Sequence, residues 1–326
     1  MPIRLTSRNI LPGIVLKIKN PYELDVDSDE LNSVVAQSLL AGTKVTYDTF
    51  DLFYLSDVLS TNLYFSKCFF DGTNYYLVEN DFNLLVYDSE FNLVKRINKN
   101  KEIALFSLVD DDVYIVYDDE IMIIDTNTFE IKETINEEND FTIMKYDGQY
   151  IWCINGTDDV LEKRNRNLTL LNAYENISGI YDMILVSDYI YLLKEDKIYQ
   201  FNKTDETVIE YVVSKVYSNM MYFNGNFILN GLSVDIYDNS FNLINTIFEP
   251  INSYSFLHKP VFDGRYFYFV AEKTLNSNKL CNIYITDHQF NIKKVFENIE
   301  NLRQIHFARE GILVLTDKKL FLLKEI

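Results

Sequence analysis

Apolar and polar residues alternate in short runs along most of the chain. A turn dipeptide containing Asp, Asn, Ser, Glu or Gly is followed by three or four apolar or aromatic residues, and this pair of features recurs. The turns begin at Asp71, Asp110, Asp147, Ser187, Asn224, Asp263 and Glu310. Successive turns are 37 to 47 residues apart, so the chain has an internal repeat of about 40 residues.

A second pattern keeps register with the first. After each apolar run comes another short strand that ends in an acid or amide, then a tight turn, then a strand that begins with an aromatic or aliphatic residue. Two examples are Asp88 followed by Phe91, and Asp238 followed by Phe241. Asp, Asn and Gly suit these turns because they tolerate positive φ or bond their own backbone. Each repeat therefore predicts four short antiparallel strands joined by hairpins, without helical periodicity.

Four antiparallel strands in about 40 residues are typical of a propeller blade. One twisted sheet cannot bury both of its faces, whereas several blades stacked around an axis bury the apolar faces between neighbours. The sequence therefore predicts an all-β, seven-bladed β-propeller over residues 44–326. Residues 45–326 resemble the propeller superfamily of the WD40, kelch, NHL and quinoprotein-like kind. Because the WD dipeptide, the double glycine and the tryptophan motifs are absent, the resemblance implies architecture and no site residues.

The last repeat predicts how the ring closes. It supplies three strands, at about 302–307, 311–315 and 320–323, and no fourth before Ile326. The segment at about 45–55 has strand-like composition and directly precedes the first blade. We expect it to pair with the last edge as the outer strand of the seventh blade, because an unpaired edge invites association.

Residues 1–43 do not belong to the repeat. They contain a strand-like stretch at 13–19, an acidic connection and a predicted short helix at about 28–40. The part up to residue 19 is basic, and its charged residues are Arg4, Arg8, Lys17 and Lys19. Two interpretations stay open: an extension that packs over its own propeller, and a docking arm for a protein partner.

Composition narrows the class of protein. The 326 residues include 30 basic and 49 acidic side chains, a net charge of −19, yet 48% are hydrophobic, which indicates a folded chain. A surface this acidic disfavours nucleic acid and anionic membranes as partners. No stretch is typical of a signal peptide or a spanning helix, so we expect a cytoplasmic or virion location. Cys68, Cys153 and Cys281 lie far apart and predict buried, reduced thiols.

Sequence motifs provide little support for catalysis. The three histidines, His258, His288 and His306, lack the spacing of a metal site or a catalytic triad, and no phosphate-binding glycine loop is present. We assign no catalytic residue, metal or cofactor, and favour a non-enzymatic protein while leaving the question open. Acidic groups at 110–112, 118–119 and 158–159 suit turns, although paired carboxylates also serve glycosidases and Ca²⁺ sites.

Three sets of residues are candidates for binding. The first is the basic arm. The second is an insertion at 272–279 in the sixth repeat, which lengthens one interior hairpin and is expected to give a surface loop that contains Glu272, Lys273, Asn276, Asn278 and Lys279. The third is Asp158 with Asp159, as acids for a glycan. Trp152 is interpreted as a core residue of its strand, with a sugar-stacking platform as the alternative.

The sequence favours a non-enzymatic interaction or structural subunit of a larger assembly. Its protein partners would bind residues 1–43 or the loops on a propeller face. The usage of Asn, Ile, Lys, Tyr and Phe is typical of an AT-rich coding sequence, and a phage virion or tail component is one concrete version of the hypothesis. The alternative is a carbohydrate-binding or carbohydrate-active propeller.

Overall fold

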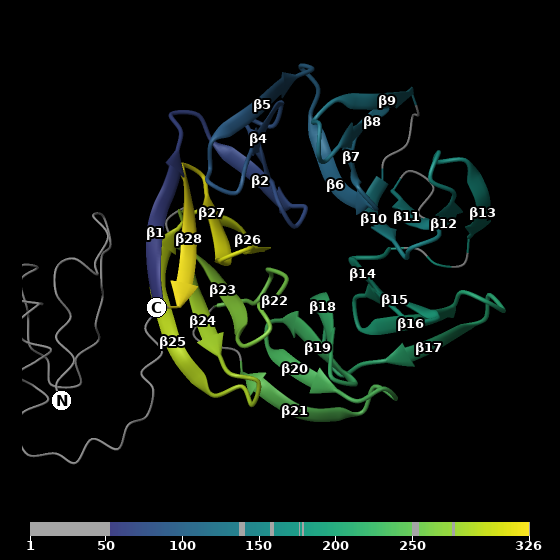
Figure 1. Cartoon of the computed structure of the whole chain (residues 1–326). Helices are drawn as coiled ribbons and strands as arrows, with labels where there is room; N and C mark the ends of the chain where they lie inside the picture. Colours follow the sequence, from purple (N-terminus) through teal and green to yellow (C-terminus); the bar gives the residue numbers. More distant parts are fainter. Residues whose placement is uncertain are drawn as a thin grey trace, which may run out of the picture.

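The fold is a ring of seven antiparallel sheets. The computed structural model describes residues 53–136, 141–156, 160–175, 177, 179–249, 254–275 and 278–325, and within these ranges every sheet has four strands. Figure 1 shows the sheets as blades around one axis, with β2, β6, β10, β14, β18, β22 and β26 innermost. The predicted seven-bladed β-propeller is confirmed. No helix in the described ranges is long and apolar enough to cross a bilayer.

Each blade follows the chain from the axis outward. Blade 1 is β2 (Phe65–Phe70), β3 (Tyr75–Glu79), β4 (Asn83–Tyr87) and β5 (Leu93–Asn98). Blade 2 is β6 (Ile103–Val109), β7 (Asp112–Tyr117), β8 (Glu120–Asp125) and β9 (Ile131–Asn136). Blade 3 is β10 (Phe141–Tyr146), β11 (Ile151–Asn155), β12 (Val160–Arg164) and β13 (Leu170–Tyr174). Blade 4 is β14 (Asp182–Val186), β15 (Tyr189–Lys194), β16 (Lys197–Asn202) and β17 (Val208–Val212).

The remaining three blades include the one that joins the two ends. Blade 5 is β18 (Tyr217–Phe223), β19 (Asn226–Gly231), β20 (Val234–Tyr237) and β21 (Leu243–Phe248). Blade 6 is β22 (Val261–Phe262), β23 (Phe267–Leu275), β24 (Asn278–Thr286) and β25 (Ile292–Glu300). Blade 7 is β26 (Leu302–Ala308), β27 (Gly311–Thr316) and β28 (Lys319–Glu325), with β1 (Phe53–Ser60) as its outer strand.

The outer strand of blade 7 comes from the start of the described chain. β1 pairs antiparallel with β28, from Phe53 opposite Glu325 to Ser60 opposite Lys319. This strand extends beyond residue 55, the expected end of the closing segment, and most of the expected range lies outside the described residues. The extension at 1–43, with its predicted strand and helix, also lies outside them.

The core lies between neighbouring blades. At the boundary of blades 6 and 7, for example, Val270 and Ile283 pack against Ile312 and Val314, and all four are fully buried. The three cysteines are buried thiols, as expected.

The Asp-Gly turns share one hydrogen-bonding pattern, which explains the first sequence signature. In blade 3, one carboxylate oxygen of Asp147 accepts the backbone N–H groups of Gln149 and Tyr150, while Gly148 adopts a φ of 95°. The second oxygen accepts the Trp152 indole N–H at 2.8 Å. Asp71 and Asp263 bind the equivalent tyrosine hydroxyls in the same way. Trp152 is fully buried, so it is a core residue and not a sugar platform.

The second signature places an aromatic residue in the left-handed region. Phe91, Phe241 and Phe290 have φ values of 62°, 57° and 65°, which is uncommon for a bulky side chain. Packing holds them there: the ring of Phe91 stacks on Tyr75 at 4.5 Å, and Phe241 lies 4.5 Å from Phe227. The preceding aspartate accepts backbone N–H groups in each turn. Most acids that recur in the repeat are therefore explained by turn geometry.

Candidate functional site

The sequence-predicted site residues fall into two groups. Arg4, Arg8, Lys17, Lys19, Asn276, Asp158 and Asp159 lie outside the described residues. Glu272, Lys273, Asn278 and Lys279 are described, and all four lie on the hairpin of β23 and β24.

The insertion of the sixth repeat lengthens its interior hairpin, as expected, but it continues as paired strands where a surface loop was expected. Both strands of the hairpin are nine residues long and remain paired as far as Leu275 opposite Asn278. The insertion lengthens two strands symmetrically, because continued pairing satisfies backbone groups that a loop would leave to water. As a result Glu272 is only 8% exposed and lies inside the structure.

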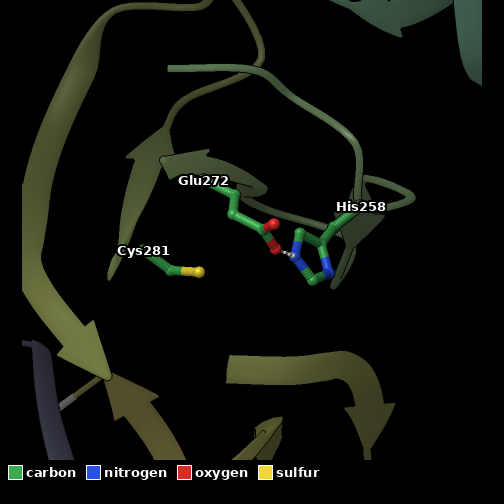
Figure 2. A group of neighbouring side chains, drawn as sticks. All are labelled: His258, Glu272 and Cys281. Atoms are coloured by element: carbon green, nitrogen blue, oxygen red, sulfur yellow. Dashed lines mark hydrogen bonds and ion pairs between the residues drawn. The ribbon is translucent and has the colours of Figure 1, made fainter. Parts of the chain in front are cut away.

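Glu272 is the centre of a small group with His258, Cys281 and Lys279, which we call the Glu272 cluster. Glu272 on β23 lies directly opposite Cys281 on β24. His258 approaches from the segment before β22, and its Nε2 lies 3.1 Å from Oε2 of Glu272 (Figure 2). The ammonium of Lys279 lies 2.9 Å from the other oxygen, Oε1. Each carboxylate oxygen therefore has its own partner.

Burial and neighbouring charges set the protonation states of this cluster. Burial lowers the pKa of His258 despite the opposing effect of Glu272, so the imidazole is neutral at pH 7. For Glu272, burial acts upward, but the hydrogen bonds from Lys279 and His258 outweigh it and the pKa is lowered overall. Burial raises the pKa of the Cys281 thiol to about 12. The cluster thus combines a neutral imidazole, a carboxylate and a protonated thiol.

A second polar group lies about the axis. Lys259 donates to both oxygens of Asp182 at 2.7 Å, although the two residues belong to blades 6 and 4. Asp182 also accepts the backbone N–H of Met220 in blade 5. Burial lowers the pKa of Lys145, and the charge of Lys259 lowers it further. Burial lowers the pKa of His306 despite the opposing effect of its hydrogen bond with the Phe307 carbonyl, and the charge of Lys145 lowers it further. Lys259 forms an ion pair with Asp182, and the charge of Asp182 opposes the lowering of the Lys145 pKa.

Three exposed apolar residues come from neighbouring backbone segments where the inner strand of blade 5 begins. They are Val216, Leu232 and Leu257, which are 59%, 62% and 48% exposed, and we call them the blade-5 patch. The backbone of Gly231, next to Leu232, lies close to the segments that carry the other two residues. A Cβ atom at Gly231 would be 2.5 Å from the carbonyl oxygen of Val216. The carbonyl of Gly231 accepts the N–H of Phe256, the neighbour of Leu257, at 2.6 Å.

Sequence reasoning missed all three features. His258, Glu272 and Cys281 are 14 and 9 residues apart, which matches no metal or catalytic motif. Lys259 and Asp182 are 77 residues apart. The one usable signal was the register of the repeat, because it places the start of each inner strand near the axis of the ring.

Comparison with known proteins identifies the fold and goes no further. No protein-family model matches the chain, and no curated protein matches it in sequence. Among solved structures, the Swd1 (Cps50) β-propeller domain of Myceliophteria thermophila superposes with a TM-score of 0.64 at 9% identity, covering 82% of this chain and 99% of that one. Streptogramin B lyase gives 0.62 at 12% identity, covering 84% and 98%. BamB from Moraxella catarrhalis gives 0.56 at 8% identity, covering 82% and 99%.

Identities this low show a shared fold alone. The fold and the comparisons together define a seven-bladed β-propeller with no family assignment, and propellers host enzymes, binding platforms and structural subunits alike.

Proposed function

We propose that this protein is a non-enzymatic interaction subunit that binds a protein partner through the blade-5 patch. The exposure of Val216, Leu232 and Leu257 is the observation that carries the proposal. Large apolar side chains that are about half exposed or more, on backbone segments that lie next to one another, mark interaction sites more often than scattered ones do. They project from turns and strand ends on a rigid scaffold, where binding residues concentrate.

Two partly exposed lysines flank the patch. Lys215 directly precedes Val216, and its side chain is 37% exposed. Lys259 follows Leu257 by two residues, and its side chain is 40% exposed. Each ammonium already binds a carboxylate of this chain, Asp235 for Lys215 and Asp182 for Lys259, so the two lysines offer a partner polar groups around an apolar centre rather than unpaired charge. A solved structure of BBS1N in complex with ARL6DN, which is similar to this chain with a TM-score of 0.62 at 10% identity, is an example of a propeller-like chain that binds another protein.

The basic arm extends the same proposal. Arg4, Arg8, Lys17 and Lys19 would anchor residues 1–43 on an acidic surface of the assembly, and a phage virion or tail component is the concrete version we favour. Association through these residues should weaken with salt, because charges on exposed groups are screened over about 10 Å at 0.1 M ionic strength.

Sedimentation of the native source tests the proposal. The full chain should travel with a larger particle, as followed by mass spectrometry of the fractions. Recombinant chain carrying Leu232→Asp should fail to join that particle. The matched control is Leu171→Asp, since Leu171 on β13 is 49% exposed but lies on blade 3. A free monomer in the source, or equal behaviour of the two variants, would refute the role of the patch.

The carbohydrate alternative now rests on Asp158 and Asp159 without Trp152. It predicts binding on a glycan array that is lost when both aspartates are replaced by Asn. Absence of binding by the unmodified chain across a broad panel would remove it.

A further inference from the structure

Blade 6 departs from the other blades at its inner strand. β22 has two residues, whereas the inner strands of the other blades have five to seven. Residues 254–260 take the place of the missing half of the strand. They are held by two backbone hydrogen bonds between Ser255 and Glu272, both 2.8 Å, and by the bond from Phe256 to Gly231. A segment with so few ladder bonds needs side-chain contacts to fix it.

The Glu272 cluster lies where this segment meets the hairpin. Figure 2 shows His258 of the segment and Cys281 of β24 on either side of Glu272, with the imidazole bonded to the carboxylate. One donor atom from each of the three residues lies within 4.8 Å of the other two. Glu272 and Cys281 are buried and His258 is nearly so, with 14% of its side chain exposed.

We propose that His258 Nε2, Glu272 Oε2 and Cys281 Sγ bind a zinc ion that pins residues 254–260 to the β23–β24 hairpin. Nitrogen, oxygen and sulfur in one set suit Zn²⁺, which accepts all three donor types. Hard cations such as Mg²⁺ and Ca²⁺ take oxygen ligands and do not match this set. Three protein ligands leave a fourth position for water.

The distances require only small movements. In a tetrahedral site with Zn–N and Zn–O bonds near 2.0–2.2 Å, the two ligand atoms are about 3.4 Å apart. His258 Nε2 and Glu272 Oε2 are already 3.1 Å apart. A ligand pair that includes the sulfur should be about 3.6 Å apart, so the widest separation, at most 4.8 Å, must close by roughly 1 Å.

Zinc binding raises the total charge of the cluster by one unit, because the ion brings two positive charges and one proton is released. Without zinc, the carboxylate of Glu272 is neutralised by Lys279, whose ammonium is on Oε1. With zinc, the thiol of Cys281 releases one proton to solvent, and the proton on Nε2 of His258 is exchanged for one on Nδ1. The carboxylate and the thiolate then neutralise the ion. Oε1 is not needed as a ligand, and Lys279, with about half of its side chain exposed, can keep that contact or turn toward water.

Metal titration of the full chain tests the proposal, with Zn²⁺ alone and Co²⁺ alone as probes. We expect one ion per chain and a sulfur-to-cobalt charge-transfer band in the near ultraviolet. Cys281→Ser should abolish the band, and both Cys281→Ser and His258→Gln should weaken zinc binding by at least about 100-fold. The matched control is Cys68→Ser, which should change neither, because Cys68 is also buried with its thiol pKa raised to about 12.

The ammonium of Lys279 provides a second test, in which the variant should bind zinc more tightly and not more weakly. Lys279→Met removes a positive charge next to the ion and should tighten zinc binding several-fold. Zinc binding no tighter than in Cys281→Ser, or a cobalt complex of the unmodified chain without the thiolate band, would overturn the proposal. Because the cobalt spectrum of the unmodified chain needs no variant, it tests the proposal even if a variant fails to fold. All of these results are independent of the blade-5 patch.

Discussion

The carboxylate of Asp235 in blade 5 should be one of the most sensitive single groups in the fold. Asp235 on β20 is fully buried and accepts hydrogen bonds from four side chains. Oδ2 accepts from Tyr217 at 2.6 Å, from Ser233 at 2.7 Å and from Lys215 at 3.0 Å. Oδ1 accepts from Thr246 at 2.5 Å. Asp235→Asn keeps the shape of the side chain but removes the charge and turns one acceptor into a donor.

The expected loss follows from what each donor can do afterwards. The ammonium of Lys215 is partly exposed and can bind water, and the Tyr217 hydroxyl keeps a contact of 2.8 Å with Tyr237. Ser233 donates to Oδ2 and Thr246 to Oδ1, so the amide group of Asn leaves one of these two hydroxyls without its acceptor, and the bonds that remain lose the charge of the carboxylate. Each buried donor left unsatisfied costs about 1–3 kcal/mol. We therefore expect Asp235→Asn to reduce the free energy of unfolding by about 3 kcal/mol, and Tm by roughly 5–10 °C.

Thermal and urea denaturation at pH 7 measure this loss. The matched control is Asp238→Asn, three residues later in an exposed turn, which should lower Tm much less. Burial pushes the pKa of Asp235 upward, but the hydrogen bonds from Thr246, Tyr217, Ser233 and Lys215 outweigh it and the pKa is lowered overall. Its contribution is therefore complete above the pKa of an unfolded aspartate, about 4, and is lost as pH falls through the folded value. Equal Tm values for the two variants at pH 7, or a difference between them that grows in acid, would refute the reasoning.

Two further predictions concern the ring closure and the close backbone approach at Gly231. Phe53→Ala should reduce the free energy of unfolding by about 3–5 kcal/mol, because the buried ring of Phe53 packs edge-on against Tyr266 with the ring centres 5.0 Å apart. The control is Leu93→Ala, at a half-exposed position of an outer strand, which should cost far less in the same thermal melts. Similar losses for the two variants would contradict a structural role for β1. Gly231→Ala should reduce the free energy of unfolding by about 1–3 kcal/mol, because the added Cβ would lie 2.5 Å from the carbonyl oxygen of Val216. Leu232→Ala is the control. An unchanged Tm for Gly231→Ala would contradict the prediction, because it would show that the backbone at Val216 moves aside without cost.

The architecture was predictable because each repeat carries two independent signals, one for the buried strands and one for the turns between them. The apolar runs indicate strands covered by blades on both sides, and the turn dipeptides fix where each hairpin reverses. Asp147 illustrates the link, since one carboxylate shapes the turn and also holds Trp152 in the core. A local signal and a packing signal therefore agree at each blade, which is the condition under which a sequence specifies one structure.

The candidate sites were not predictable for the opposite reason. A contact such as Lys259 with Asp182 depends on which residues meet across the axis, and nothing local marks either residue. The Glu272 cluster depends on the length of one hairpin. The insertion could have formed a loop or two longer strands, and only the pairing of Leu275 with Asn278 shows which of these occurred. Asp235 carries no motif either, because its donors come from four different positions in blade 5.

The pairing of β1 with β28 has a consequence for synthesis on the ribosome. Phe53 emerges early, but its partner Glu325 is added 272 residues later. At about 5–20 residues per second, β1 waits roughly 15–55 s before its partner strand exists. During that time blades 1 to 6 can form in order, while a strand with a large aromatic anchor stays without its final neighbour. Closure of the ring therefore waits for the synthesis of β28, and a chain that stops before β28 would leave the ring open.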